Sequence, residues 1–332
     1  MKKSGIDRLQ RLLSQIMKSY SNFDTATTNL DIIDLEEAAN ITEDFIKTCQ
    51  NTEMVERLDL ERDVYIIGDI NGQLSTLKLL LEKINADSNF VFLGNYIKEG
   101  PKSLYCILVV FMLKIINPKT VVLRGCAETL ESGTLFNDIL FHYLGKDVYE
   151  SQSFKENYEN CTRLYKMFKL AFSCMPLCAI VGNTYFLSHA GIAQDENFLE
   201  RIQHIKVPFF LDSLDFCSPQ KPDTTDPKDV VTIAMELTWN TGRAQTSQNG
   251  NQSSSNTFSD LSNSGNFKSY NDSAVQTFLR TNKLRTIINA HDPVKGYLIN
   301  SSQTCITLTS NGQYRSLLCL SSNGTWKVIE FF

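Results

Sequence analysis

Three short apolar segments between residues 64 and 123 each end in a polar turn, and this repetition constrains the fold more than any other feature of the chain. Residues 64–67 lead into GDINGQ and a helical pattern, residues 90–93 lead into GNYIKEGP and an apolar helix over 103–116, and residues 121–123 lead into RGCAET. Successive units of this kind are typical of an α/β sheet whose polar turns lie at the carboxyl ends of the strands. We therefore expect the three turns to converge on one site.

Two amphipathic helices are predicted ahead of the sheet, within residues 1–50. The first has leucine and isoleucine at helical spacing, and the second runs from about residue 35 to residue 49. Asp34, with Glu37 three residues later, resembles a capping box at the start of the second helix. We expect both helices to pack on a single domain formed by residues 51–332.

Charge and composition exclude several classes of protein. The net charge of -5 is mixed in sign along the chain, so there is no basic face for nucleic acid and no polybasic membrane patch. The longest apolar run, residues 104–113, is too short to span a bilayer, and the first residues do not have the pattern of a signal peptide. Nine cysteines without a CxxC pair argue against a zinc ribbon or a disulfide framework. We expect a soluble protein of the cytoplasm, with the nucleus as a second possibility.

Two histidines in the second half of the chain follow predicted strands. His189 follows residues 185–188 in the turn HAG, and His291 follows the strand predicted over residues 286–290. Residues 244–268 are rich in Ser, Asn, Gln and Gly, which predicts a flexible loop. From residue 296 onwards short strands are predicted, with Asn311-Gly312 and Asn323-Gly324 as hairpin turns.

Five motifs, GDINGQ, GNYIKEG, RGCAE, SHAG and INAHD, occur in this order. Together they resemble the metal and phosphate turns of the metal-dependent Ser/Thr phosphoprotein phosphatases, within the calcineurin-like phosphoesterases. The resemblance covers roughly residues 35–332 and also includes LTWN at 237–240. It implies an α/β fold of the calcineurin-like metallophosphoesterase type, with a central β-sandwich flanked by helices in a single domain.

The metal positions of this family are only partly kept. Three residues match metal ligands of the family: Asp69, His189 and His291. Asn71 stands where the family has a metal-binding histidine, Asn95 where it has the metal-bridging aspartate, and Cys126 where it has a ligand asparagine. The resemblance therefore implies a degenerate metal site.

The catalytic and phosphate-binding positions depart further. Ala127 stands at the catalytic histidine, and Lys98 at the acid that supports it. Glu99 and Asn289 stand at phosphate-binding arginines. A carboxylate repels a phosphoester dianion and a neutral amide cannot replace an arginine clamp, so we predict no catalytic and no phosphate-binding residue. Lys98, Arg124 and Arg243 could supply cations from elsewhere in the chain, but none occupies a phosphate-binding position of the family.

Several interpretations of the metal site remain open. Two adjacent divalent cations need a bridging anion, which the neutral Asn95 does not supply, so a two-metal centre is disfavoured. A vestigial or single-metal site would use Asp69, Asn95, Cys126, His189 and His291. Cys126 with the two histidines suits Zn²⁺, whereas the oxygen ligands suit Mn²⁺. Alternatively, Asp69 accepts hydrogen bonds from backbone amides at a helix N-terminus, and the histidines are structural.

The leading hypothesis is a pseudophosphatase, a Ser/Thr phosphatase-like protein that is impaired or inactive as a hydrolase and acts as a scaffold for a protein partner. That partner would be a phosphoprotein or would resemble a regulatory subunit. The alternative is an active, diverged metal-dependent phosphoesterase that uses Asp69, His189 and His291 around one metal. A binder of nucleotides or other small ligands is a third possibility.

Overall fold

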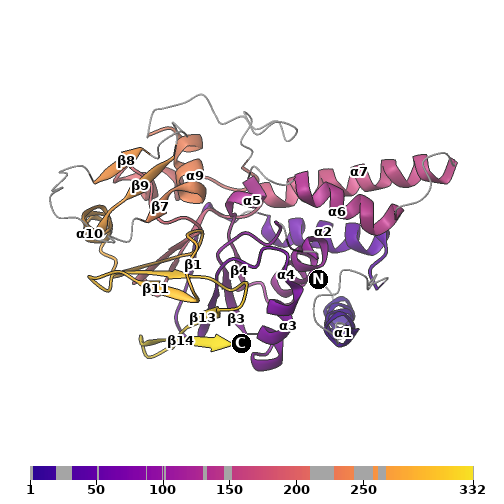
Figure 1. The fold of residues 1–332 in the computed structure, drawn as a ribbon, viewed down its shortest axis with the longest axis horizontal. Helices are drawn as coiled ribbons and strands as arrows, with labels where there is room; N and C mark the ends of the chain where they lie inside the picture. The colour runs from indigo at the N-terminus through magenta and orange to yellow at the C-terminus, as the bar shows by residue number, and fades with distance from the viewer. Residues whose placement is uncertain are drawn as a thin grey trace.

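Two β-sheets form the centre of the molecule, and helices lie on their outer faces (Figure 1). The computed structural model describes residues 3–19, 32–50, 52–86, 88–98, 100, 102–129, 133–145, 152–209, 228–242, 257–260 and 267–331. The first sheet has the strand order β14 (Trp326–Phe331), β13 (Arg315–Leu320), β2 (Val64–Ile67), β3 (Asn89–Phe92) and β4 (Val121–Val122). The second has the order β1 (Val55–Leu58), β5 (Cys178–Val181), β6 (Tyr185–Ser188), β10 (Thr286–Asn289), β12 (Cys305–Leu308) and β11 (Tyr297–Ile299).

The inner faces of the two sheets share one apolar core. Ile66 and Val91 of the first sheet are fully buried in the same cluster as Leu187 and Ile288 of the second. Ile67, next to Ile66, packs into a different cluster on the outer face, because successive side chains of a strand point to opposite faces. Both faces of β2, β3 and β4 are therefore covered, which explains why these strands are largely apolar.

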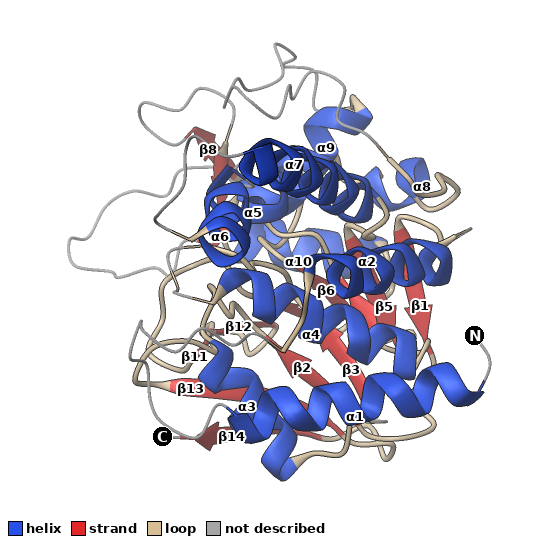
Figure 2. Ribbon diagram, turned by 90° about the vertical axis from the view of Figure 1, so that its right-hand side faces the viewer, coloured by secondary structure: helices blue, strands red, loops and turns tan. Residues whose placement is uncertain are grey.

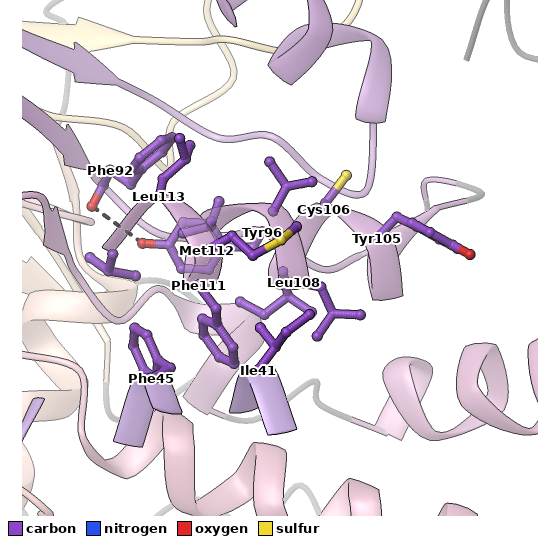
Figure 3. Packing of buried hydrophobic residues seen from close by; sticks show 14 of the residues in the cluster. Ile41, Phe45, Phe92, Tyr96, Tyr105, Cys106, Leu108, Phe111, Met112 and Leu113 are labelled. Carbon is purple, nitrogen blue, oxygen red and sulfur yellow. Dashed lines mark hydrogen bonds between the residues drawn. The ribbon is translucent and has the colours of Figure 1, made fainter. Parts of the chain in front are cut away.

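Helices cover the outer face of the first sheet (Figure 2). They are α1 (Lys3–Ser19), α2 (Leu35–Cys49), α3 (Leu74–Lys83), α4 (Ser103–Ile116), α6 (Gly133–Leu144) and α7 (Gln152–Ser173). Every residue of α4 is buried, because α4 lies between the sheet and the outer helices. Phe45 of α2 stacks on Phe111 of α4 with ring centroids 3.8 Å apart (Figure 3). The Asp34 carboxylate caps α2 by accepting a hydrogen bond from the backbone N–H of Glu37, as the capping pattern predicts.

The outer face of the second sheet carries α8 (Phe198–Ile202), α9 (Val230–Trp239) and α10 (Asp272–Thr281). A small third sheet lies beside them, with the order β7 (Thr241–Gly242), β9 (Lys268–Tyr270) and β8 (Phe258–Asp260). The prediction of a flexible loop over 244–268 is therefore wrong at residues 258–260 and 268. Phe258 pairs with the buried Tyr270 across the two strands, and this long-range partner is invisible to local composition. Residues 244–256 and 261–266 lie outside the described part of the chain.

One predicted hairpin is absent. Asn323-Gly324 joins β13 to its antiparallel partner β14, as predicted. Asn311-Gly312 instead lies between β12 and β13, which belong to different sheets. The turn carries the chain from one sheet of the sandwich to the other. Asn311-Gly312 therefore forms a turn, as predicted, but it does not join β12 and β13 as a hairpin.

None of the described helices combines the length and the apolar character that a bilayer crossing needs. The apolar α4 has 14 residues and is buried inside the protein.

The stacked Phe45 and Phe111 rings make the attachment of α2 testable. We expect Phe45→Ala to lower the free energy of unfolding by about 3–5 kcal/mol, because a fully buried aromatic side chain is lost and a cavity remains. Urea unfolding of the wild type and the variant measures the difference. Phe141→Ala is the control, since Phe141 is 52% exposed and its removal should change stability by less than about 0.5 kcal/mol. An equal effect of the two substitutions would show that α2 is not part of the cooperative core.

Candidate functional site

The polar turns of both sheets meet at one edge of the sandwich. Strands β2, β3 and β4 are parallel neighbours, so Asp69, Asn95 and Cys126 emerge side by side, Cys126 as the first residue of α5 (Cys126–Thr129). Strands β6 and β10 are parallel neighbours in the second sheet and deliver His189 and His291, whose ring centroids are 5.1 Å apart. The three turns converge, as their repetition in the sequence predicts.

Asn95 lies at the centre of this site, 1% exposed. Its Nδ2 donates to Asp69 Oδ2 at 3.0 Å. Its Oδ1 accepts from the backbone N–H of Ala127 at 3.0 Å and from Cys126 Sγ at 3.3 Å. A backbone N–H only donates and a carboxylate only accepts, so these partners fix which end of the amide faces which neighbour. Its donor end therefore points at Asp69.

His189 is fully buried and held in one orientation. Its Nδ1 lies 3.0 Å from the carbonyl oxygen of Leu93, to which it donates, so Nε2 carries the lone pair. This Nε2 is buried without a hydrogen-bond partner among the described residues. Burial lowers the pKa of His189 to about 3, so the ring is neutral at pH 7. The 3.7 Å approach of Nδ1 to Asp69 Oδ1 is thus not an ion pair.

His291 and Cys126 complete the ligand group. His291 has a left-handed backbone, with φ 65°, and burial lowers its pKa to about 3. Its Nδ1 lies 3.7 Å from Cys126 Sγ. One ligand atom from each of Cys126, His189 and His291 lies within 4.8 Å of the other two. These three residues are the ones in the described part of the chain that could hold a metal ion together.

Asp69 does not cap a helix. The residue that caps α3 is Gln73, whose side chain makes no capping hydrogen bond. Asp69 instead accepts from the Asn95 amide and, at 3.4 Å, from the backbone N–H of His291. Burial raises the pKa of Asp69. The interpretation of Asp69 as a helix N-terminal acceptor is therefore wrong, because its partners come from β3 and β10.

Asn71 takes part in the site mainly through its backbone. Its φ of 50° is left-handed, its N–H donates to the Asn95 carbonyl at 2.8 Å, and its own carbonyl accepts from Gly100 at 3.0 Å. Its side-chain Oδ1 is buried without a hydrogen-bond partner among the described residues. The turn GDINGQ thus supports the neighbouring turn of β3.

The resemblance places phosphate-binding arginines of the family at Glu99 and Asn289, and the structure describes the second of these positions. Asn289 is fully buried; its Nδ2 donates to Tyr270 Oη at 2.9 Å and its Oδ1 accepts from the Thr307 hydroxyl at 2.8 Å. The charge of Lys98 acts on Asp69 and on both histidines, whose pKa values it lowers. Glu99 lies outside the described residues.

Arg124, another cation considered from the sequence, is bonded to protein carbonyl groups. Arg124 is 4% exposed, and its guanidinium donates to the carbonyls of Phe172 at 2.8 Å and Phe209 at 3.1 Å. It therefore holds α7 and the segment after α8 rather than a ligand. Arg243 lies outside the described residues.

Glu128 is a structural centre of the site that the sequence interpretation missed. Its Oε2 accepts the N–H groups of Asn95 at 2.8 Å and Gly125 at 3.0 Å, and its Oε1 those of Tyr96 at 2.8 Å and Ile97 at 3.4 Å. Burial raises the pKa of Glu128 to about 7, against the effect of these donors, which lower it. The only local signal was its place in RGCAE, two residues after a predicted ligand.

Replacement of the Glu128 carboxylate tests this role. We expect Glu128→Gln to lower the free energy of unfolding by about 2–4 kcal/mol, because the new NH₂ group would face two backbone donors. Chemical denaturation at pH 8, where the wild-type carboxyl is ionised, measures the loss. Glu43→Gln is the control, since Glu43 is 55% exposed in a surface ion pair and should change stability by less than about 1 kcal/mol. A Glu128→Gln variant as stable as the wild type would contradict the role assigned to these bonds.

Comparison with known proteins identifies the architecture around this site. The family model described as calcineurin-like phosphoesterase matches residues 63–295, which include all five convergent positions. Among solved structures, the chain is similar to a protein serine/threonine phosphatase from Saccharomyces cerevisiae, itself described as similar to human phosphatase PP5. That match has a TM-score of 0.66 at 18% sequence identity and covers 90% of each chain.

A second solved structure shows the same fold more distantly. A cold-active protein-tyrosine phosphatase of a psychrophilic Shewanella matches with a TM-score of 0.50 at 13% identity, over 85% of this chain and 84% of its own. At such identities the likeness concerns the fold alone. The predicted fold class, a calcineurin-like β-sandwich flanked by helices, is confirmed by the family model and by the S. cerevisiae structure.

Proposed function

Because the chain belongs to the calcineurin-like phosphoesterase family, we propose that it is a phosphatase-like protein that keeps the family's fold, has lost its hydrolysis, and works by binding another protein. The fold is that of a Ser/Thr phosphatase-like phosphoesterase. The loss of chemistry and the scaffold role are our inference from the residues of the site.

The hydrogen bond from Asn95 Nδ2 to Asp69 Oδ2, 3.0 Å long, is the observation that carries this proposal. The donor end of the Asn95 amide therefore faces Asp69, whereas an aspartate in this position would offer acceptor oxygens. Its oxygen is already engaged by Ala127 N–H and the Cys126 thiol. Rotating the amide to offer oxygen to a metal would leave a donor facing the Ala127 N–H, which is unfavourable for a buried group. A pair of cations does not fit these residues.

The catalytic positions support the same conclusion. Ala127 has no proton to give to a leaving group, and it is fully buried against the Asn95 oxygen. Loss of a general acid alone slows hydrolysis by about 10²- to 10⁴-fold. Loss of the metal pair removes the activation of water as well. We propose that the site holds at most one divalent cation, Zn²⁺ or Mn²⁺.

Measurement of hydrolysis tests the proposed loss. We expect wild-type protein with added Mn²⁺, Mg²⁺ or Zn²⁺ to hydrolyse a chromogenic phosphoester no faster than the Asp69→Ala variant, because neither has a catalytic acid or a metal pair. Release of the chromophore over time is the readout, with an active family phosphatase as the assay control. A Mn²⁺-dependent rate that Asp69→Ala abolishes would overturn the proposal.

That outcome would favour the second candidate function, a diverged single-metal phosphoesterase. Its supporting observation is that Asp69, His189 and His291 lie together, with Asp69 3.7 Å from one histidine and 3.4 Å from the backbone of the other. One cation held there would activate a water molecule for attack on phosphorus. The absence of a phosphate clamp at Asn289 weighs against this candidate.

The protein partner would recognise the folded surface rather than the metal chemistry. We expect a partner isolated with the wild-type chain to bind Asp69→Ala with a Kd within about twofold, since a rigid interface away from a substitution is little changed. Millimolar inorganic phosphate should not compete, because the clamp positions carry no arginine. Calorimetry of both chains measures the two effects. A partner that phosphate displaces, or that Asp69→Ala no longer binds, would show that the site itself is the binding surface.

We also propose a reducing compartment, the cytoplasm or the nucleus, as the place where the protein works. The eight cysteines in the described part of the chain are buried and none forms a disulfide there. Proteins of oxidising compartments commonly join such residues.

A further inference from the structure

We propose that Cys126, His189 and His291 bind a single Zn²⁺ ion, which joins the two sheets of the sandwich and serves stability rather than hydrolysis. The proposal holds whether or not the protein binds a partner. It concerns residues that depart from the family's two-metal arrangement, because a cysteine replaces an amide ligand at this position.

The three ligand atoms are already near the spacing that zinc requires. With Zn–S and Zn–N bonds of about 2.3 and 2.0–2.1 Å, tetrahedral ligand atoms lie about 3.3–3.6 Å from one another. Cys126 Sγ lies 3.7 Å from His291 Nδ1, and no pair in the group is separated by more than 4.8 Å. Closing the widest separation takes a side-chain movement of about 1 Å.

His189 presents its ring nitrogen as a ligand would. The Leu93 carbonyl fixes the Nδ1 proton, as a backbone carbonyl commonly does behind a metal-bound histidine. The buried Nε2 then has a lone pair without a hydrogen-bond partner among the described residues. A buried acceptor of this kind is costly unless something binds it, and a cation would satisfy it.

The donor set selects zinc and limits the site to one ion. A thiolate is a soft ligand that favours Zn²⁺ over Mn²⁺ or Mg²⁺, and imidazole suits zinc equally. Binding deprotonates the Cys126 thiol, the proton passes to solvent, and Asn95 Oδ1 keeps its bond to Ala127 N–H. The Asp69 carboxylate, near both histidines, supplies a second negative charge to balance the cation. A second ion would meet the N–H donors of Asn95.

The position of the ligands explains why such an ion would be structural. Cys126 follows β4 of the first sheet, whereas His189 and His291 follow β6 and β10 of the second. A zinc ion held by all three would link the two layers directly. A cation that binds only to the folded state raises the free energy of unfolding. Zinc binding should therefore be detectable in unfolding experiments as well as by metal analysis.

Metal analysis and unfolding of the full-length chain together test the proposal. We expect purified wild type to contain about one zinc per chain and to unfold at a lower temperature after chelation, with recovery when Zn²⁺ is added back. Cys126→Ser should bind zinc at least about tenfold more weakly and lose the chelator effect. The matched control is Cys319→Ser, which replaces a buried cysteine on β13 and should keep both the zinc affinity and the chelator effect.

Cobalt substitution gives a readout on the wild type alone, so the test does not depend on whether the variant folds. Wild type loaded with Co²⁺ should show the near-ultraviolet sulfur-to-cobalt charge-transfer band of a thiolate ligand, and Cys126→Ser should not. The proposal would be overturned if the wild type contained no zinc and added Zn²⁺ did not stabilise it. It would also be overturned if bound Co²⁺ showed no thiolate band. Either result would leave the proposed loss of hydrolysis untouched, because that loss rests on Asn95 and Ala127.

Discussion

The Glu128 carboxylate organises the edge of the sandwich on which every other feature of the site depends. It accepts three consecutive N–H groups from the turn after β3 and one from the turn after β4. Two turns from neighbouring strands are thereby held on one anion. Gly125 makes this approach possible, since a Cβ at this position would collide with the backbone nitrogen of Asn95. Asn95 is left with φ 56°, a left-handed conformation that asparagine tolerates.

From that fixed backbone the Asn95 side chain reaches three segments. Its amide joins Asp69 after β2 to Cys126 and Ala127 after β4. The same position in a two-metal phosphatase site must offer charge to two cations, whereas here it offers hydrogen bonds to protein groups. Asn95 therefore makes the centre of the site part of the internal hydrogen-bond network.

The sequence predicted the parts of the molecule that depend on local periodicity. Helix α4 was predicted at residues 103–116, its observed bounds, because its apolar run has clear ends. The hairpin wrongly assigned to Asn311-Gly312 shows the limit, since a turn signal does not say which strand pairs with which. Residues 258–260 form a strand only because Tyr270, distant from them in sequence, is buried beside Phe258.

The same division applies to the site. The order of the motifs predicted that Asp69, Cys126, His189 and His291 would meet, because the ends of neighbouring parallel strands meet. It did not predict the direction of the Asn289 amide, which depends on Thr307 of the neighbouring strand β12 and on Tyr270 of the third sheet. Nor did it indicate Glu128, whose partners are backbone groups that any residue type would provide.

The arrangement also indicates how the fold would tolerate the proposed loss of a metal pair. A second aspartate at residue 95 would place two carboxylates about as close as the observed 3.0 Å contact. At that distance, with an effective dielectric constant of about 20, like charges repel by about 5 kcal/mol. Bound cations offset such repulsion, and so does a proton taken up by one of the two carboxyl groups. Asparagine replaces it with a hydrogen bond to a charged group, which contributes about 1.5–3 kcal/mol. Asparagine at residue 95 therefore satisfies the Asp69 carboxylate without a bound cation.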